Sequence, residues 1–245
     1  MKISIVTAVW NRARTIGEAL ESVQRQSHRD IEHVIQDGGS TDGTLQVIER
    51  LADERTCVVS ERDSGIYDAI NTGIARATGD VIGLMHSDDI FASDNVLSDV
   101  AVALADREVD GVYGDLQYVS ATDPDRVIRY WRSGSYGPSA LKRGWMPPHP
   151  TLYLRREVFE RWGAYDTSFR ISADYDAMLR WLNNGVRLAY VPRVLVKMRV
   201  GGQSNASLGS ILRKSLEDYC AIRCNKVGGL GTLALKNFSK IEQFI

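Results

Sequence analysis

Leu84-Met85-His86-Ser87-Asp88-Asp89 is the stretch that decides the fold. It ends a short apolar run, Val81 to Met85, which is entered from a Gly-Asp turn and predicts a buried strand. Two adjacent carboxylates therefore stand directly at a strand end. Clustered carboxylates repel each other unless a cation or a proton lies between them, and their oxygens suit a hard divalent ion such as Mg²⁺ or Mn²⁺. The alternative is an Asp-Asp turn that caps the next segment.

The chain before this stretch alternates between two patterns. Apolar, β-branched runs predict strands at residues 3–9, 31–36, 58–60 and 81–85. Apolar residues at helical spacing predict helices near residues 15–23, 42–51 and 66–77. Thr15 and Glu18 have the spacing of a capping box for the first helix. This alternation predicts an α/β fold with a parallel sheet and helices on both faces.

Polar residues follow each of these predicted strands. They are Asn11, Asp37, Asp63 and the Asp88-Asp89 pair. Because ligands of such sheets bind at the carboxyl ends of the strands, these residues predict one binding site. No Gly-x-Gly-x-x-Gly follows the first strand, which argues against a dinucleotide-binding fold.

The second half of the chain is less regular. We expect a helix at 94–104 and a strand at 111–114, followed by partly loop structure between residues 130 and 150. After a return to strand at 151–154, we expect a helix from Ile171 to Gly185 and a strand at 186–191. The tail from Ser207 onward is helical in pattern.

Composition narrows the function classes. The 245 residues suffice for one large α/β domain with an appendage, and the net charge of -1 gives no basic field for nucleic acid. The three cysteines make neither a disulfide framework nor a zinc site, so we expect reduced, partly buried thiols in a cytoplasmic protein. Met1-Lys2 runs into a strand without a signal-peptide pattern. No apolar stretch reaches the ~18–20 residues that span a bilayer.

Taken together, the motifs resemble family 2 glycosyltransferases with the GT-A fold, in the bacterial branch that builds polysaccharides and lipid-linked oligosaccharides. The resemblance covers roughly residues 1–205. It rests on Ile5-Val6-Thr7-Ala8-Val9-Trp10-Asn11, Asp37-Gly38-Gly39-Ser40-Thr41-Asp42-Gly43-Thr44, Asp63-Ser64-Gly65-Ile66-Tyr67-Asp68-Ala69-Ile70-Asn71-Thr72-Gly73, Ser87-Asp88-Asp89 and Ser172-Ala173-Asp174-Tyr175-Asp176.

The resemblance implies an organisation for the chain. It implies a Rossmann-like, mostly parallel central sheet with helices on both faces. Residues 1–205 would form the glycosyltransferase domain, with a nucleotide-binding half at 1–90 and an acceptor-binding half at 91–205. A helical appendage would follow at 206–245.

The resemblance also implies roles for individual residues. The nucleotide would lie against Thr7, Val9, Asn11, Asp37, Asp63, Asn71 and Asp88, with Asp37 on the base. Asp89 would hold Mn²⁺ or Mg²⁺. Asp174 would be the catalytic base, although Ala173 stands where the wider family often has Glu; a helix N-cap is the alternative role for Asp174. His149, Asp176 and Trp145 are weaker candidates for contacting the acceptor or the metal.

The implied activity is metal-dependent transfer of a sugar, with inversion, from a nucleotide-diphosphate sugar. The expected donor is a UDP-sugar, and the expected acceptor is a glycan or a polyprenyl-diphosphate-linked glycan. A divalent ion neutralises the leaving diphosphate, and one carboxylate base suffices for direct displacement. Two alternatives remain. A sugar nucleotidyltransferase would carry a Gly-rich basic loop after the first strand, whereas residues 8–12 lack glycine; the other alternative is a non-catalytic sugar-nucleotide-binding module.

The tail offers a further expectation. Leu235, Phe238, Ile241, Phe244 and Ile245 recur near one helix face, with Lys236 and Lys240 beside them. Such a helix can lie in a membrane interface, which would place the protein on the cytoplasmic face of the inner membrane. The alternative is a helix that packs on its own domain or on the second subunit of a homodimer.

Overall fold

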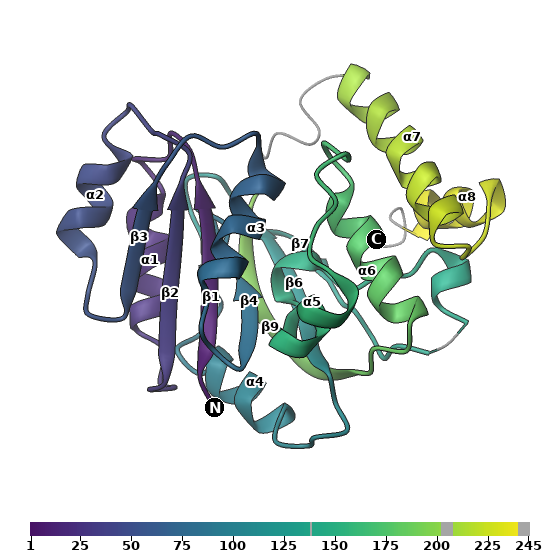
Figure 1. Cartoon of the computed structure of the whole chain (residues 1–245), viewed down its shortest axis with the longest axis horizontal. Coiled ribbons are helices and arrows are strands. Elements are labelled where there is room, and N and C mark those ends of the chain that lie inside the picture. Colours follow the sequence, from purple (N-terminus) through teal and green to yellow (C-terminus); the bar gives the residue numbers. More distant parts are fainter. Residues whose placement is uncertain (138, 202–207, 240–245) are drawn as a thin grey trace.

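The computed structural model describes residues 1–137, 139–201 and 208–239 (Figure 1). Its strands are β1 (Ile3–Val9), β2 (Ile31–Asp37), β3 (Thr56–Ser60), β4 (Val81–Leu84), β5 (Ile90–Phe91), β6 (Gly111–Val119), β7 (Val127–Trp131), β8 (Tyr153–Arg155) and β9 (Leu188–Arg199). Its α-helices are α1 (Ile16–Gln24), α2 (Thr44–Leu51), α3 (Ile66–Arg76), α4 (Val96–Ala103), α5 (Arg156–Trp162), α6 (Ala173–Asn183), α7 (Leu208–Cys224) and α8 (Leu230–Ser239). Two 3₁₀ turns, η1 (Leu141–Arg143) and η2 (His149–Thr151), precede β8.

These strands form one nine-stranded sheet in the order β3-β2-β1-β4-β8-β6-β9-β5, with β7 paired to β6. The first four strands in this order are parallel to one another. β8 runs antiparallel between β4 and β6, whereas β6 and β9 are parallel. The expected α/β fold is therefore confirmed, and the carboxyl ends of β1 to β4 share one edge.

The alternation of β1 explains why helices cover both faces. Ile3 and Ile5 are buried in the core formed with α1 and α4, whereas Val6 is buried in the core formed with α3, α5 and α6. Figure 1 shows α3 in front of the parallel strands and α1 behind them. A strand buried on both faces reads as a continuous apolar run, which is the pattern of this segment.

β6 and β9 extend further along the chain than their sequence patterns predict, and β7 overlaps a region expected to be partly loop. β9 continues past Pro192, where the register with β6 shifts between Gly114 and Leu116. This irregularity accommodates a proline that cannot donate to a sheet ladder. β7 contains Tyr130 and Trp131, in the region expected to be partly loop.

The predicted capping box on α1 is wrong. Thr15 is the N-cap residue, but its side chain makes no capping hydrogen bond. The Glu18 carboxylate instead lies 2.5 Å from the Arg199 guanidinium at the end of β9. A long-range ion pair has replaced the local capping interaction.

The C-terminal helices pack on α6. Ala221, Ile222 and Val227 are buried against Tyr175 and Leu179. Figure 1 shows α7 and α8 together on the α6 side of the molecule. The face of α7 that carries Ala221 and Ile222 therefore packs on the protein's own domain, which is one of the alternatives expected for the tail.

The sequence pattern predicts Lys236 beside an apolar helix face that could meet a membrane, but the Lys236 side chain is buried. Its Nζ lies 2.6 Å from Asp218 of α7 and 3.4 Å from the centroid of the Tyr175 ring, and the Asp218–Lys236 pair is buried. Lys240, Ile241, Phe244 and Ile245 lie outside the described residues.

Two further features of the chain bear on its surroundings. None of the helices in the described ranges is long and apolar enough to cross a membrane. The three free cysteines, Cys57, Cys220 and Cys224, are exposed, which corrects the expectation that they are partly buried.

Candidate active site

The loops that follow β1 and β2 are joined by hydrogen bonds. The Asn11 backbone adopts a left-handed conformation with φ of 52°, which Asn tolerates better than most residues. Its N–H donates to Ser40 Oγ at 2.8 Å, and its Oδ1 accepts the Thr41 N–H at 2.9 Å. Asn11 therefore fixes one strand-end loop to the other.

A cavity of about 520 Å³ opens beside these loops. It is lined by Trp10, Asn11, Gly38, Gly39, Thr41, Arg62, Asp63 and Gly65. Trp10 is 57% exposed, an unusual state for a tryptophan. The sequence prediction named Asn11 and Asp63 as site residues and missed Trp10, although its place at the end of β1 was the available signal.

Three residues that were predicted to contact the nucleotide are buried and do not line the cavity. Thr7 Oγ1 is buried and lies 2.9 Å from His33 Nε2. The Val9 side chain is buried with α1 and α2, and its carbonyl accepts the Gly38 N–H at 2.9 Å. Asp37 is fully buried at the end of β2. The cavity lining includes none of the three.

The Asp89 carboxylate is held by a residue of β9. It is 1% exposed, and its Oδ1 accepts the Arg199 N–H at 3.1 Å. Its Oδ2 is buried without a hydrogen-bond partner among the described residues. Burial, and then the neighbouring Asp88 carboxylate, raise the pKa of Asp89 well above its usual range.

The unpartnered Oδ2 of Asp89 shows whether the residues present fit a metal ion. A bound cation would satisfy Oδ2 and would favour the charged carboxylate. The described residues contain no cluster of three or more His, Cys, Asp or Glu side chains that could hold a metal. Mg²⁺ and Mn²⁺ are commonly held by one or two carboxylates together with substrate phosphates, so Asp89 with Asp88 beside it fits that donor set.

Arg199 is a functional neighbour that sequence reasoning missed. Its Nη1 donates to the Asp88 carbonyl at 2.8 Å, and its Nη2 donates to Glu18 at 2.5 Å. Arg199 itself is 6% exposed, whereas its partner Glu18 is 53% exposed. Arg199 thereby fixes the loop that carries Asp88 and Asp89.

Asp174 lies in the first turn of α6 and not at its cap. Ser172 is the N-cap residue, so the N-cap alternative for Asp174 is not what forms. The Tyr67 hydroxyl donates to the Ile171 carbonyl at 2.7 Å and lies 3.2 Å from Asp174 Oδ1. Tyr67 therefore ties the start of α6 to α3.

Two histidines lie near these carboxylates, of which His149 is buried and His86 is half-buried. The rings of His86 and His149 are 5.9 Å apart, and His149 Nε2 lies 2.9 Å from the Tyr165 hydroxyl. Burial lowers the pKa of His149 to about 4. Burial also lowers the pKa of His86, against the opposing charges of Asp88 and Asp174. Asp88 and Asp174, which are 86 residues apart in the sequence, thus act electrostatically on the same imidazole.

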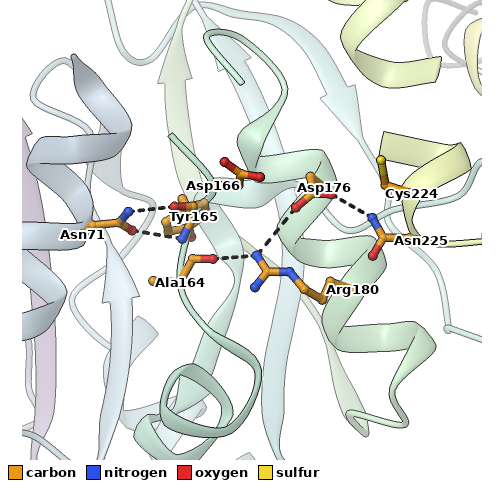
Figure 2. Close-up of a pocket in the computed structure, with 8 residues that line it drawn as sticks. All are labelled: Asn71, Ala164, Tyr165, Asp166, Asp176, Arg180, Cys224 and Asn225. Carbon is orange, nitrogen blue, oxygen red and sulfur yellow. Dashed lines mark hydrogen bonds and ion pairs between the residues drawn. The ribbon is translucent and has the colours of Figure 1, made fainter. Parts of the chain in front are cut away.

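Asn71 and Asp176 lie at a second cavity, also of about 520 Å³, between α3 and α6 (Figure 2). Asn71 exchanges two hydrogen bonds with the Tyr165 backbone, at 2.7 and 2.9 Å. Asp176 accepts the Asn225 side-chain amide at 2.7 Å and lies 3.6 Å from Arg180. Both side chains are engaged in holding elements together, and neither lines the strand-end cavity.

Trp145 belongs to an aromatic cluster. Its Nε1 donates to the Ser133 carbonyl at 3.0 Å, and its ring packs against Tyr113 and Tyr136. These contacts account for the indole as a packing residue of the aromatic cluster.

Glu217 of α7 is a second neighbour that sequence reasoning missed. Its carboxylate accepts the backbone N–H groups of Arg170, Ile171 and Ser172 at 3.3, 2.8 and 3.0 Å. These residues lead directly into the turn that carries Asp174. The C-terminal helix therefore takes part in positioning the predicted base.

Comparison with known proteins identifies a family to which the chain is similar. The family model described as Glycosyl transferase family 2 matches residues 4–167. A PGL/p-HBAD biosynthesis glycosyltransferase from Mycobacterium bovis BCG is 30% identical over 226 residues, which cover 87% of this chain and 83% of the relative.

Solved structures share the fold at low identity. Staphylococcus aureus TarS (residues 1–349) in complex with UDP-GlcNAc superposes with a TM-score of 0.72 at 18% identity, over 93% of this chain and 66% of that chain. The Pyrobaculum calidifontis mannosyltransferase PcManGT, in complex with GDP-Man and Mn²⁺, superposes with a TM-score of 0.70 at 19% identity, over 97% of this chain and 69% of that chain. With the fold, the strand-end carboxylates and the sequence match in agreement, the chain belongs to glycosyltransferase family 2.

Proposed function

We propose that the protein is a metal-dependent, inverting glycosyltransferase that moves a sugar from a nucleoside-diphosphate sugar to a glycan or polyprenyl-linked acceptor. The observation that carries the proposal is geometric: Asp88 stands beside the buried Asp89 carboxylate, whose Oδ2 has no hydrogen-bond partner among the described residues, and Asp174 lies 3.2 Å from the Tyr67 hydroxyl at the start of α6. One carboxylate belongs to the nucleotide side of the sheet, and the other begins a helix of the second half. Sugar transfer needs polar groups of this kind on two sides, one for the sugar donor and one for the acceptor hydroxyl.

The donor nucleotide would occupy the cavity at the ends of β1 and β2. Its polar rim offers Asn11 and Asp63, and its open wall offers the Trp10 indole. The TarS and PcManGT complexes contain a UDP-sugar and a GDP-sugar, respectively. A nucleoside-diphosphate sugar is the ligand class that matches both the cavity and these neighbours.

Asp89 would hold Mg²⁺ or Mn²⁺, with Asp88 beside it. Its unpartnered buried Oδ2 supports this assignment. When bound, such an ion supplies Lewis-acid stabilisation of the negative charge that develops on the leaving diphosphate. Arg199 keeps Asp89 Oδ1 and the Asp88 carbonyl in place, so that the carboxylate need not reorganise.

Asp174 would accept the proton of the acceptor hydroxyl. The acceptor oxygen forms a bond to the anomeric carbon while the bond from that carbon to the diphosphate breaks. The proton passes to the Asp174 carboxylate. Direct displacement of this kind inverts the anomeric carbon and requires no covalent sugar–enzyme intermediate. Tyr67 would hold Asp174 in orientation, because its hydroxyl lies 3.2 Å from Oδ1.

A lipid-linked acceptor would bring the protein to the membrane surface through α7 and α8. Their exposed faces carry Ile211, Leu212, Leu216, Leu230, Leu235 and Phe238. Apart from the buried Lys236–Asp218 pair, residues 208–239 hold four basic side chains and one acidic side chain, within a chain of net charge -1. An apolar surface with adjacent positive charge suits an anionic bilayer. A homodimer through the same surface is the competing proposal.

The test is a panel of nucleotide sugars incubated with the protein and Mn²⁺, with candidate acceptors and mass-spectrometric readout. Release of free nucleoside diphosphate together with a glycosylated acceptor supports transfer. Pyrophosphate release would identify a nucleotidyltransferase, and tight binding without turnover would identify a binding module. The Asp174→Asn protein serves as the matched control, because it should bind the donor without releasing the diphosphate.

A further inference from the structure

His149 presents one ring nitrogen to solvent from an otherwise buried imidazole. It stands in η2 between Pro148 and Pro150, which restrict the backbone on both sides, and only 9% of it is exposed. Its Nε2 lies 2.9 Å from the Tyr165 hydroxyl. Its Nδ1 has no hydrogen-bond partner in the described part of the chain and is open to solvent, whereas the Nδ1 of His33 is buried. His149 therefore has one nitrogen held by the protein and one nitrogen that a ligand can reach.

The hydrogen-bond network assigns the proton of this imidazole. Burial lowers the pKa of His149 to about 4 and raises the pKa of Tyr165, so both groups are neutral at physiological pH. The Tyr165 side chain is buried, and its hydroxyl has no partner other than His149 Nε2 among the described residues. If Nε2 carried the proton, the buried O–H of Tyr165 would have no acceptor, which costs free energy. We therefore assign the proton to Nδ1, with Tyr165 as the donor to Nε2.

Tyr165 links His149 to the predicted base. Its ring stacks on that of Tyr67, with centroids 5.8 Å apart, and the Tyr67 hydroxyl lies 3.2 Å from Asp174 Oδ1. Asn71 of α3 holds the Tyr165 backbone through two hydrogen bonds (Figure 2). The His149 ring is therefore fixed relative to α3, the same helix that contacts the base.

His149 also lies within electrostatic reach of Asp174. The Asp174 charge opposes the effect of burial on the pKa of His149, and it acts in the same way on His86. The His86 ring, two residues before Asp88, lies 5.9 Å from the His149 ring. An N–H donor and a carboxylate thus belong to one part of the site.

We propose that His149 donates a hydrogen bond from Nδ1–H to a second hydroxyl of the acceptor while Asp174 accepts the proton of the reacting hydroxyl, so that the enzyme selects a sugar ring as its acceptor and rejects a lipid phosphate. The proposal rests on the proposed function, because it assumes a hydroxyl acceptor at Asp174. It deepens that function by naming the acceptor class and a residue that recognises it. Tyr165 is a positioning residue, because it acts on the acceptor only through His149.

The chemistry of the possible acceptors favours a sugar. A sugar ring carries several hydroxyls, so one can approach the carboxylate while the oxygen of another accepts the Nδ1–H bond. A lipid phosphate is negatively charged, so the Asp174 carboxylate would repel it and the neutral imidazole would not balance its charge. A simple alcohol would use the base and leave His149 without a partner. An N–H donor near a carboxylate therefore suits a ring with two or more hydroxyls.

The first experiment varies the acceptor. Transfer is measured with methyl glycosides of common hexoses, with their monodeoxy analogues and with a polyprenyl phosphate, using the full chain and Mn²⁺. We expect transfer to a methyl glycoside and none to the polyprenyl phosphate. One analogue that keeps the reacting hydroxyl should show a kcat/KM lowered about tenfold, the value of one hydrogen bond. In His149→Gln that analogue and its parent should react equally, because the variant has no donor at the δ position.

The second experiment separates binding of the acceptor from support of Tyr165. The amide nitrogen of Asn stands at the δ position, as Nδ1 does, whereas the amide of Gln reaches the ε position, where Nε2 meets Tyr165. His149→Asn should therefore keep more of the kcat/KM for the acceptor than His149→Gln, whereas His149→Gln should be the more resistant of the two to urea. A purely structural role predicts the same order in both measurements. His28→Asn and His28→Gln, at the surface, are the matched controls, and UDP affinity should be constant in all four variants.

The outcomes separate this proposal from the function on which it rests. If no acceptor of any class receives sugar, the proposed function fails and the acceptor assignment fails with it. If sugar passes to the polyprenyl phosphate alone, or if every monodeoxy analogue that keeps the reacting hydroxyl reacts like its parent, the assignment is overturned while glycosyl transfer stands. Activity and urea resistance that follow the same order in the two His149 variants would also overturn it, because the ring would then serve only to support Tyr165.

Discussion

The backbone N–H of Arg199 donates a 3.1 Å hydrogen bond to Oδ1 of Asp89, and Oδ2 of the same carboxylate has no partner among the described residues. One oxygen is thus fixed by the protein while the other stays available. A buried carboxylate oxygen without a partner costs free energy in the unliganded protein. The same oxygen is the strongest candidate for contact with a cation.

Asp89→Asn should therefore separate stability from function. We expect loss of Mn²⁺-dependent UDP binding and of turnover, with no decrease in the free energy of unfolding of the unliganded protein, because a buried charge is removed. Calorimetry with and without Mn²⁺ and urea unfolding provide the two readouts. Asp94→Asn, at an exposed position, is the control. Metal-dependent affinity that survives in Asp89→Asn would contradict the metal role.

Asp174→Asn should lower kcat by ~10²–10⁴ while donor affinity stays nearly constant. The amide keeps the shape of the side chain but cannot accept the proton. Steady-state kinetics with a defined acceptor measures the effect. Asp176→Asn is the matched control two residues away, since Asp176 contacts Asn225 and Arg180 outside the strand-end cavity. Equal losses in the two variants would argue against a specific base at position 174.

Glu217→Ala should lower kcat without changing donor affinity. The carboxylate accepts three backbone N–H groups of residues 170–172, which enter the turn that carries Asp174. Loss of bonds to a charged acceptor also costs about 1.5–3 kcal/mol of stability. Glu217→Gln retains one acceptor oxygen and should restore part of kcat. If Glu217→Ala changes the melting temperature alone, α7 supports the fold but not the base.

Membrane contact should depend on the exposed apolar residues of α7 and α8. We expect the full chain to co-sediment with anionic vesicles at low salt, and the Leu212→Ser/Leu216→Ser/Phe238→Ser variant to remain in the supernatant. Truncation is a poorer test, because it would remove the buried ion pair between Lys236 and Asp218. A matched control changes the exposed apolar residues Val127 and Ile128 of β7. If neither protein binds vesicles and the triple variant dissociates a dimer, the surface is a subunit interface.

His33 should make the protein less stable in weak acid. Burial lowers the pKa of His33 from 6.5 to about 4, so between these values the unfolded chain binds a proton that the folded chain does not. Stability therefore falls as pH decreases through this window, by about 2 kcal/mol for this residue between pH 7 and pH 5. His33→Gln should reduce the difference between urea-unfolding free energies at the two pH values by that amount. His28→Gln, at the surface, should leave the difference unchanged.

The first half of the fold was predictable because its signals are local. β1, β2 and α3 have apolar patterns that the burial of their side chains explains directly. The strand-end positions of Asn11, Asp63, Asp88 and Asp89 follow from the same patterns. By contrast, β7 is half exposed and lies at the sheet edge, so its sequence lacks the apolar run of a buried strand.

The parts of the site that escaped prediction depend on contacts distant in sequence. Glu18 has a capping-box position, yet its partner is Arg199, 181 residues later. The sequence around Arg199 and around Glu217 carries no pattern that indicates that each residue holds a loop of the site. Asp37 and Asp63 both follow strands, and only the structure distinguishes the carboxylate used within a loop from the one that faces the cavity.

The bond between Arg199 and the Asp88-Asp89 loop also bears on the order in which the protein assembles during synthesis. The carboxylates leave the ribosome early, whereas the residue that fixes them follows 110 positions after Asp89. The nascent chain can complete β1 to β4 and still lack the contact that fixes the Asp88-Asp89 loop until β9 has joined the sheet beside β6. Truncated products that end before β9 would then contain the first four strands without the contact that fixes this loop.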